Sequence, residues 1–257
     1  MSSSAPALQI PQENLSATSS RTPWLMFFSR ITLFLVFQVL FTLGFYLVGS
    51  RNAWEAGAAI WPLGVFIVNL IITAILVRLY KAEGKNYWDI YRIRSVDIKK
   101  DLLVLLGFLF IAGPAGFFPN ILLSTWLFGD PQISLNLIMR PLPLWFVIAF
   151  CVVLFPLTQG LAELPTYFCY SMPRIQAQGF PRWMGVALAA LMLSLQHLTV
   201  PFLLDIRFIL WRAFMYLLFA LVVGIMLNWR PRLLPYMAIV HILMDVSFGA
   251  MFLGVAY

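Results

Sequence analysis

The 257-residue sequence contains few charged residues and very few side chains that titrate near neutral pH. Only 11% of its residues are Asp, Glu, Lys or Arg, and it has two histidines and two cysteines. In contrast, 62% of the residues are apolar and the mean hydropathy is +0.90. A soluble domain needs more polar surface than this chain contains. The composition therefore excludes a mainly soluble protein and predicts one whose surface largely faces lipid.

Further absences exclude other classes of protein. The Ser-rich segment 1–22 lacks the basic start and apolar core of a secretory signal, so we expect a disordered cytoplasmic tail there. Cys151 and Cys169 both lie in apolar stretches, where free cysteines usually behave as small buried hydrophobic groups. The net charge of +7 comes from basic residues in short loops between apolar runs, so it indicates membrane topology and no nucleic-acid partner.

Long apolar runs are what the sequence has in abundance. A membrane-spanning helix needs about 20 apolar residues. The runs between breakers predict seven helices, at 23–49, 57–80, 101–128, 143–172, 182–199, 207–228 and 234–256. Pro114 or Pro119 can split the third run, which adds an eighth short span. We therefore expect an all-α, polytopic membrane bundle of seven or eight transmembrane helices, with residues 23–257 forming one domain.

The basic residues predict how this bundle is oriented. Stretch 78–100 carries seven Lys or Arg residues and is therefore assigned to the cytoplasm. With seven spans, alternation places thirteen of the seventeen basic residues on the cytoplasmic side, Arg30 and Arg174 among them. The opposite side receives Arg51, Arg140, Arg207 and Arg212. We predict a multi-pass protein of the plasma membrane, in the lipid bilayer, with a cytoplasmic N-terminus.

Four ionisable residues lie deep in the predicted helices: Glu163, His197, His241 and Asp245. A charge at the bilayer centre costs about 2.5–3.5 kcal/mol on insertion scales, so these groups must face a cavity or one another. His241 and Asp245 are four residues apart and share one helix face. Glu163 shares a face with two polar residues of its own helix, and the nearby Pro165 frees a backbone carbonyl near Leu161 and bends the helix.

Other polar residues in the spans have a simpler explanation. Hydrogen bonds between helices are the usual role of such groups in membrane bundles. We expect this role for four residues, Gln38, Asn69, Gln159 and Ser194. We expect Arg212 either to extend its side chain to the membrane surface or to pair with Asp205 near the membrane edge.

Two histidines and two carboxylates support more than one chemistry. A buried Glu can act as general base for a water molecule, and neutral imidazoles can hold that water and donate a hydrogen bond to an oxyanion. The same four residues could bind a divalent metal such as Zn²⁺, although the compact H-E-x-x-H helix signature is missing. Ion-coupled transport also uses such groups. The lack of an internal repeat disfavours a transporter.

Three segments in this order carry a resemblance to a known family: "ELPTYFCYSMPRI", "LSLQH" and "HILMD". They are similar to the motifs of the CPBP intramembrane endopeptidases, the family of CaaX prenyl proteases and of bacteriocin-processing or self-immunity proteins. Alignment with a typical "EELLFRGYLLPRL" makes Glu163 the first, catalytic Glu, and it matches Tyr170, Pro173 and Arg174 to the trailing residues. The resemblance covers about residues 143–250.

The match departs from the family pattern at four positions. The second Glu is replaced by Leu164, the Arg by Phe168, the Gly by Cys169 and the Phe of the second motif by Leu193. A rival register makes Glu163 the second Glu, with Ala162 in place of the first, and this register implies an inactive relative. In the preferred register, the missing Glu and Arg lie four residues apart. The loss of both leaves neither charge buried alone.

The resemblance implies an intramembrane peptidase that cleaves a membrane-associated peptide or protein with water activated by Glu and His. Glu163 would be the base and His197 would hold the water, while His241 and Asp245 would support the oxyanion. The mechanism would be of the glutamic type or metal-dependent. Two other functions stay open. The protein could be a catalytically silent relative that binds a peptide or toxin as an immunity protein, or it could be an ion-coupled carrier.

Overall fold

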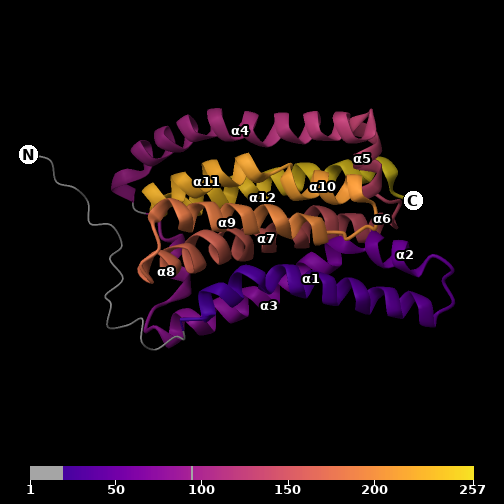
Figure 1. The fold of residues 1–257 in the computed structure, drawn as a ribbon, viewed down its shortest axis with the longest axis horizontal. Coiled ribbons are helices and arrows are strands. Elements are labelled where there is room, and N and C mark those ends of the chain that lie inside the picture. The colour runs from indigo at the N-terminus through magenta and orange to yellow at the C-terminus, as the bar shows by residue number, and fades with distance from the viewer. Residues whose placement is uncertain (1–19, 94) are drawn as a thin grey trace, which may run out of the picture.

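The computed structural model describes residues 20–93 and 95–257, without the side chain of Ser95, and it is helical throughout, with no strand in the described part of the chain (Figure 1). The predicted tail at 1–22 lies almost entirely outside the described residues. The α-helices are α1 (Thr22–Leu47), α2 (Ala53–Ala59), α3 (Trp61–Ala82), α4 (Ile98–Phe128), α5 (Pro131–Ile138), α6 (Leu144–Phe146), α7 (Phe155–Leu164), α8 (Met172–Ala177), α9 (Arg182–Gln196), α10 (Ile206–Phe214), α11 (Leu217–Trp229) and α12 (Leu234–Met251). The short 3₁₀ and π segments are η2 (Tyr87–Tyr91), η3 (Ser95–Asp97), η4 (Val147–Leu154), η5 (Pro165–Ser171), η6 (His197–Thr199), η7 (Pro231–Leu233) and η8 (Phe252–Val255).

Six helical stretches of the described chain are long and apolar enough to cross a membrane, so the protein is a multi-pass membrane protein. They are Thr22–Leu47, Trp61–Ala82, Ile98–Phe128, Leu144–Ala177, Ile206–Trp229 and Pro231–Val255. The predicted helix 182–199 corresponds to α9, which has only 15 residues and a length of about 22 Å at 1.5 Å per residue. The seven or eight predicted spans are therefore not confirmed.

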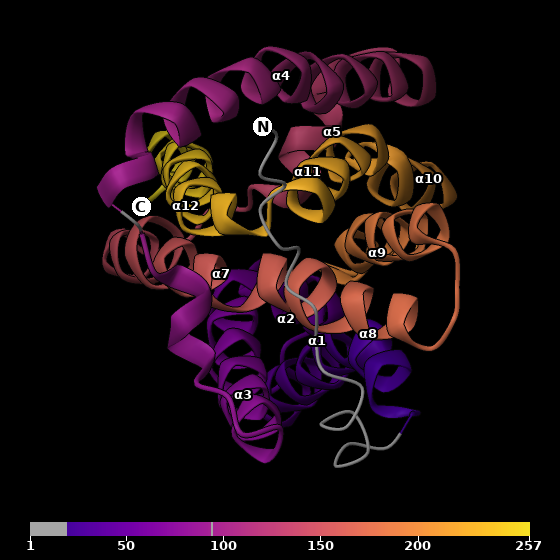
Figure 2. The ribbon, with the colours of Figure 1, turned by 90° about the vertical axis from the view of Figure 1, so that its left-hand side faces the viewer.

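The helices lie lengthwise beside one another (Figures 1 and 2). Helices α1 and α3 form one side of the bundle, α7 to α12 form its middle, and α4 lies along the opposite outer side. Helix α4 runs unbroken through Pro114 and Pro119, so the split predicted there does not occur. Its large apolar side chains, such as Leu103, Phe110 and Trp126, are mostly exposed, which is the arrangement that lipid contact favours.

Tyrosine hydroxyl groups complete the hydrogen bonding of the long stretch from α6 to α8. Pro165 has no N–H to donate to the carbonyl of Leu161 one turn earlier, as the sequence predicts, and the chain changes there from α-helix to the π segment η5. The Tyr87 hydroxyl of η2 donates to that Leu161 carbonyl. The neighbouring Tyr91 hydroxyl donates to the carbonyl of Gly160 at 2.9 Å. The segment after α3 therefore satisfies acceptors of the helix that carries Glu163.

A second proline of this stretch is compensated in the same way. Pro173 cannot donate to the carbonyl of Cys169, which accepts instead from the Tyr80 hydroxyl at 3.0 Å and from the Arg174 guanidinium at 3.3 Å. Arg174 also forms a bidentate ion pair with Glu83, with N–O distances of 2.7 and 2.5 Å, and both side chains are buried. This pair fastens the end of α3 to α8.

Helix α12 approaches the chain of η4 and α7 closely at two glycines. A Cβ atom on Gly249 would lie 2.0 Å from the carbonyl oxygen of Cys151, so only glycine fits there. A Cβ atom on Gly160 would lie 2.7 Å from the end of the Ile242 side chain. The contacts at Ile242 and Gly249 lie on either side of Asp245 along α12. They therefore hold the polar face of α12 against α7.

Polar contacts at the ends of the helices confirm some predictions and correct one. The Gln38 amide exchanges two hydrogen bonds with the backbone of Phe202, at 2.6 and 2.7 Å, and the Ser194 hydroxyl donates to the carbonyl of Ala213. Both residues thus link separate parts of the bundle, as expected. The predicted pair between Arg212 and Asp205 is wrong, because each has other partners.

Asp205 caps the start of α10 and pairs with Arg207 at 3.0 Å. Arg212 donates instead to backbone carbonyls of His197 and Val200, where η6 leaves α9. These carbonyls follow the last turn of α9, and that of His197 also accepts from the Val200 backbone N–H at 3.3 Å. Carbonyls at a helix end lack the regular helical donors, and the guanidinium supplies further ones. The buried Arg212 therefore has a local role in closing α9.

Candidate functional site

Glu163 lies on α7 in the middle of the bundle and is only 2% exposed. Two side-chain amides donate to its Oε2 atom, that of Gln159 one turn earlier on α7 and that of Gln196 at the end of α9, the latter at 2.5 Å. The Arg30 guanidinium of α1 lies 3.7 Å from the same oxygen. One oxygen of Glu163 is therefore surrounded by donors.

Arg30 is fully buried and does not lie in a cytoplasmic loop, so its predicted place among the thirteen cytoplasmic basic residues is wrong. It sits about 12 Å along α1 from Thr22, at 1.5 Å per residue. Its guanidinium donates to the oxygens of Gln196 at 2.6 Å, of Asn69 at 2.7 Å and of Gln159 at 3.0 Å. Arg30 thereby joins α1, α3, α7 and α9 in one polar network.

The other oxygen of Glu163, Oε1, faces the two polar residues of α12. The His241 Nε2 atom lies 3.4 Å from Glu163 Oε1 and 3.5 Å from Asp245 Oδ2. One ring nitrogen thus lies between two carboxylates, and a single N–H can point at only one of them at a time. Among the described residues, His241 Nδ1 and Asp245 Oδ2 have no hydrogen-bond partner. The prediction that these groups face one another is confirmed for Glu163, His241 and Asp245.

His197 lies beside these three residues without bonding to them. Its Nδ1 atom is 2.8 Å from the carbonyl of Leu193, and its ring packs edge-on against Tyr216 with centroids 4.8 Å apart. Since a carbonyl can only accept, Nδ1 carries the proton and Nε2 keeps a free lone pair in the neutral ring. No hydrogen bond or ion pair joins His197 to Glu163, His241 or Asp245 in the described part of the chain.

The residues present do not fit a metal. The described chain contains no group of three or more His, Cys, Asp or Glu side chains arranged to hold an ion. His197 uses one nitrogen on a backbone carbonyl, and Glu163 Oε2 is occupied by amide donors. These side chains therefore lack the free ligand atoms that Zn²⁺ or another ion would need.

The geometry fits acid–base chemistry at a single carboxylate oxygen. Oε2 of Glu163 is held by its donors, while among the described residues Oε1 has only the long contact to His241. The edge of the site is formed by Asp245, whose side chain is 17% exposed, and by the half-buried His197. A proton acceptor therefore lies in the interior, with two imidazoles nearby.

Three further members of the network were not placed in the site from the sequence: Arg30, Asn69 and Gln196. Asn69 was expected to bond between helices, which it does, through Arg30, Thr158 and Gln159. A signal for Arg30 was present, because it is a lone cation in the apolar run 23–49 and intramembrane cations usually have a buried partner. Gln196 directly precedes His197 and carried no signal of its own.

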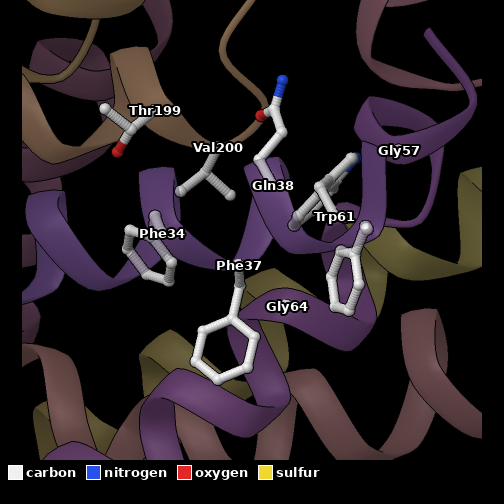
Figure 3. Close-up of a pocket in the computed structure, with 9 residues that line it drawn as sticks. Phe34, Phe37, Gln38, Gly57, Trp61, Gly64, Thr199 and Val200 are labelled. Atoms are coloured by element: carbon white, nitrogen blue, oxygen red, sulfur yellow. The ribbon is translucent and has the colours of Figure 1, made fainter. Parts of the chain in front are cut away.

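The small cavity shown in Figure 3 lies elsewhere, between α1, α3 and the turn after α9, and Glu163 does not line it. Its volume is about 10 Å³, room for about one water molecule, and its walls include Phe34, Gln38 and Trp61. Comparison of the chain with family models, with curated proteins and with solved structures gives no match.

Proposed function

We propose that the protein is an intramembrane peptidase that hydrolyses a peptide bond of a membrane-associated peptide or protein. The proposal rests on the different surroundings of the two carboxylate oxygens of Glu163. Amide groups donate hydrogen bonds to Oε2, whereas Oε1 faces His241. The resemblance of the segments around Glu163, His197 and His241 to the CPBP motifs supports the same reaction. The buried position of the site suits a substrate that arrives from the bilayer.

The reaction begins with proton removal from water. Oε1 of Glu163 takes one proton while the water oxygen forms a bond to the peptide carbonyl carbon, which gives a tetrahedral intermediate with an oxyanion. An N–H of His241 donates to this oxyanion, and Asp245, whose Oδ2 lies 3.5 Å from His241 Nε2, helps to hold the ring beside Glu163. Glu163 then returns the proton to the peptide nitrogen as the C–N bond breaks, and the products are a carboxylic acid and an amine.

His197 is the second group for holding water. Its Nε2 lone pair accepts a hydrogen bond from the attacking water once the substrate is bound, because Nδ1 is already committed to Leu193. In the structure, His241 contacts Glu163 Oε1 directly, so the imidazole must move aside for the water to enter. Substrate binding supplies this rearrangement, since catalytic contacts often tighten only in the complex.

Turnover of a membrane-tethered peptide library by the purified protein tests the proposal. Glu163→Gln keeps the shape of the side chain but removes the base, and we expect the rate to fall by 10²–10⁴-fold or more, the usual contribution of a positioned base. His241→Ala is expected to lower the rate as well. The matched control is Glu55→Gln, the same chemical change at an exposed residue of α2.

Activity of Glu163→Gln close to that of the wild type would exclude this mechanism. One observation favours a second candidate, a silent relative that binds a peptide. Glu163 is saturated on one oxygen and in contact with His241 on the other, as in a structural ion-pair network. Absence of turnover by the wild type on the whole library, together with saturable binding of a peptide, would support that candidate.

A further inference from the structure

We propose that Arg30 of α1 is a positioning residue, which acts through the amides of Gln159 and Gln196 to reserve Oε1 of Glu163 for the reacting proton. The inference rests on the proposed function. It extends the active site beyond the segment 143–250 that carries the motif resemblance, to the first helix of the protein.

The direction of each hydrogen bond supports this role. Arg30 can only donate, so the side-chain oxygens of Gln159 and Gln196 must turn towards it, at 3.0 and 2.6 Å. The NH₂ group of each amide then points the other way, and both donate to the same oxygen of Glu163. Asn69 supports the same orientation of Gln159 by donating to its oxygen at 2.9 Å, and the Tyr167 hydroxyl supports that of Gln196 at 3.1 Å. Arg30 is the donor common to both glutamines, and its charge strengthens its hydrogen bonds. Arg30 therefore couples the orientations of the two amides.

Each of the three guanidinium nitrogens of Arg30 has a partner within the protein. Its Nε atom is bonded to Gln196, Nη1 to Asn69 and Nη2 to Gln159, and Nη2 also lies 3.7 Å from Glu163. The side chain has no exposed surface. Arg30 therefore does not contact substrate, and its effect on the reaction must pass through the amides.

The position of Phe168 explains why the cation comes from another helix. In the resembling family an arginine stands at this position, four residues after a second glutamate. Here the Phe168 ring fills the space beside Gly224 of α11, where a Cβ atom would lie 2.8 Å from it. Both Phe168 and Leu164 are buried in an apolar cluster. The cation that accompanies Glu163 is instead supplied across the bundle, by α1.

The test compares Arg30→Lys and Gln196→Met with Gln38→Met. Lysine keeps the charge but cannot span three acceptors, and Gln196→Met removes one of the two donors to Glu163. Gln38→Met is the matched control, because it also removes a buried amide on α1, but within the part of the chain that the structure describes this amide bonds only to Phe202. For each variant, kcat and KM are measured on the tethered peptide, and infrared spectroscopy records the carboxylate band that disappears in Glu163→Gln.

We expect Arg30→Lys and Gln196→Met to lower kcat by about 10²-fold, the loss that a misplacement of about 1 Å can cause. KM should stay within about threefold of the wild type, because binding of the ground state is not touched. The Glu163 carboxylate band should shift in both variants and stay in place in Gln38→Met. The proposal would be overturned if Gln196→Met had the infrared band and the kcat of the wild type. This outcome is decisive even if Arg30→Lys does not fold.

The infrared measurement separates this proposal from the proposed function. If the wild type hydrolyses no peptide, the proposed peptidase function is wrong. The infrared band of the Glu163 carboxylate still shows whether Arg30 and Gln196 orient this side chain. A band that shifts in both variants supports the positioning role at this carboxylate, and a band that shifts in neither overturns it.

Discussion

A buried ion pair such as Arg30–Glu163 contributes less to stability than its attraction suggests, since both groups lose their hydration on folding. Here the loss is offset by hydrogen bonds, because Arg30 has three uncharged acceptors in addition to the carboxylate. The polar network fixes one arrangement of four helices, which apolar contacts alone specify less strictly. The main effect of the Arg30–Glu163 pair is thus to fix the positions of these side chains, and its contribution to the free energy of unfolding is small.

The Glu83 carboxyl group, between the spans that end at Ala82 and begin at Ile98, should make stability depend on pH. Burial by itself would raise its pKa, but hydrogen bonds and charge from Arg174, and a smaller contribution from Lys85, outweigh burial and hold the pKa below its usual value. A lowered pKa in the folded state adds stability above the ordinary value of about 4.3, and this stability is lost as the pH falls through the lower folded value.

We therefore expect the thermal unfolding midpoint in detergent to fall as the pH is lowered from about 5 towards 3. In Glu83→Gln this decline should be shallower, because the titrating group is gone. The control Glu55→Gln changes an exposed carboxyl group that forms no ion pair in the described chain, so it should keep the slope of the wild type. Equal slopes in all three proteins would show that Glu83 is not stabilised by Arg174.

At the scale of the elements, apolar runs predict most helix positions, because lipid requires long apolar helices. The starts predicted at 23, 182, 207 and 234 lie within one residue of α1, α9, α10 and α12. Breaks inside runs were harder to predict. Pro119 leaves α4 intact, whereas the run 207–228 is interrupted between α10 and α11 without any proline. The outcome depends on which tertiary partners satisfy the backbone, which a single sequence does not reveal.

The contact between α12 and η4 leads to a prediction about Gly249. In Gly249→Ala, the new Cβ atom would lie 2.0 Å from the carbonyl oxygen of Cys151 and 2.7 Å from its carbon. Both are backbone atoms and cannot move independently, so the two segments must separate. We expect a loss of about 1–3 kcal/mol or more in the free energy of unfolding, as for overpacked cores, measured by denaturant titration in detergent micelles.

Gly44→Ala on α1 is the matched control, because a Cβ atom there meets nothing within 4 Å. It should be neutral or stabilising by up to about 1 kcal/mol, since alanine favours helix over glycine. Because Gly249 lies one turn beyond Asp245, the alanine variant should also move His241 away from Glu163 and lower peptidase activity. An unfolding midpoint for Gly249→Ala equal to that of Gly44→Ala would contradict the close approach.

At the scale of the whole molecule, the sequence predicts part of the site. The pairing of His241 with Asp245 follows from helix periodicity alone. The contact of His241 with Glu163 joins residues far apart in the chain and depends on packing between α7 and α12. Arg30 was counted with the cytoplasmic basic residues, because charge near the end of a first span usually marks the cytoplasmic side. Its buried position follows only once Gln159 and Gln196 surround it.

The orientation in the membrane remains a prediction that thiol labelling can test. The connections α3–α4, α8–α9 and α11–α12 lie at the end of the bundle where α1 begins, and the C-terminus lies at the other end (Figure 1). Val96 is 96% exposed at the first end, and Leu204 is 81% exposed at the other. With the N-terminus cytoplasmic, an impermeant reagent outside intact cells should label Leu204→Cys and leave Val96→Cys unlabelled.

Both variants are made in a background in which Cys151 and Cys169 are replaced by alanine, and permeabilised cells serve as the control in which both must react. Labelling of Val96→Cys from outside would reverse the orientation. It would also place the basic stretch 78–100 outside the cell, against the bias that basic loops normally show.

The Tyr87 hydroxyl that satisfies Leu161 also bears on biosynthesis. A backbone carbonyl left unpaired in lipid costs several kcal/mol, and Pro165 creates that risk in the helix that carries Glu163. Tyr87 precedes Leu161 in the chain by 74 residues, so a ribosome completes the donor well before the acceptor. The order of synthesis thus lets an earlier segment receive the proline-containing helix as it enters the bilayer.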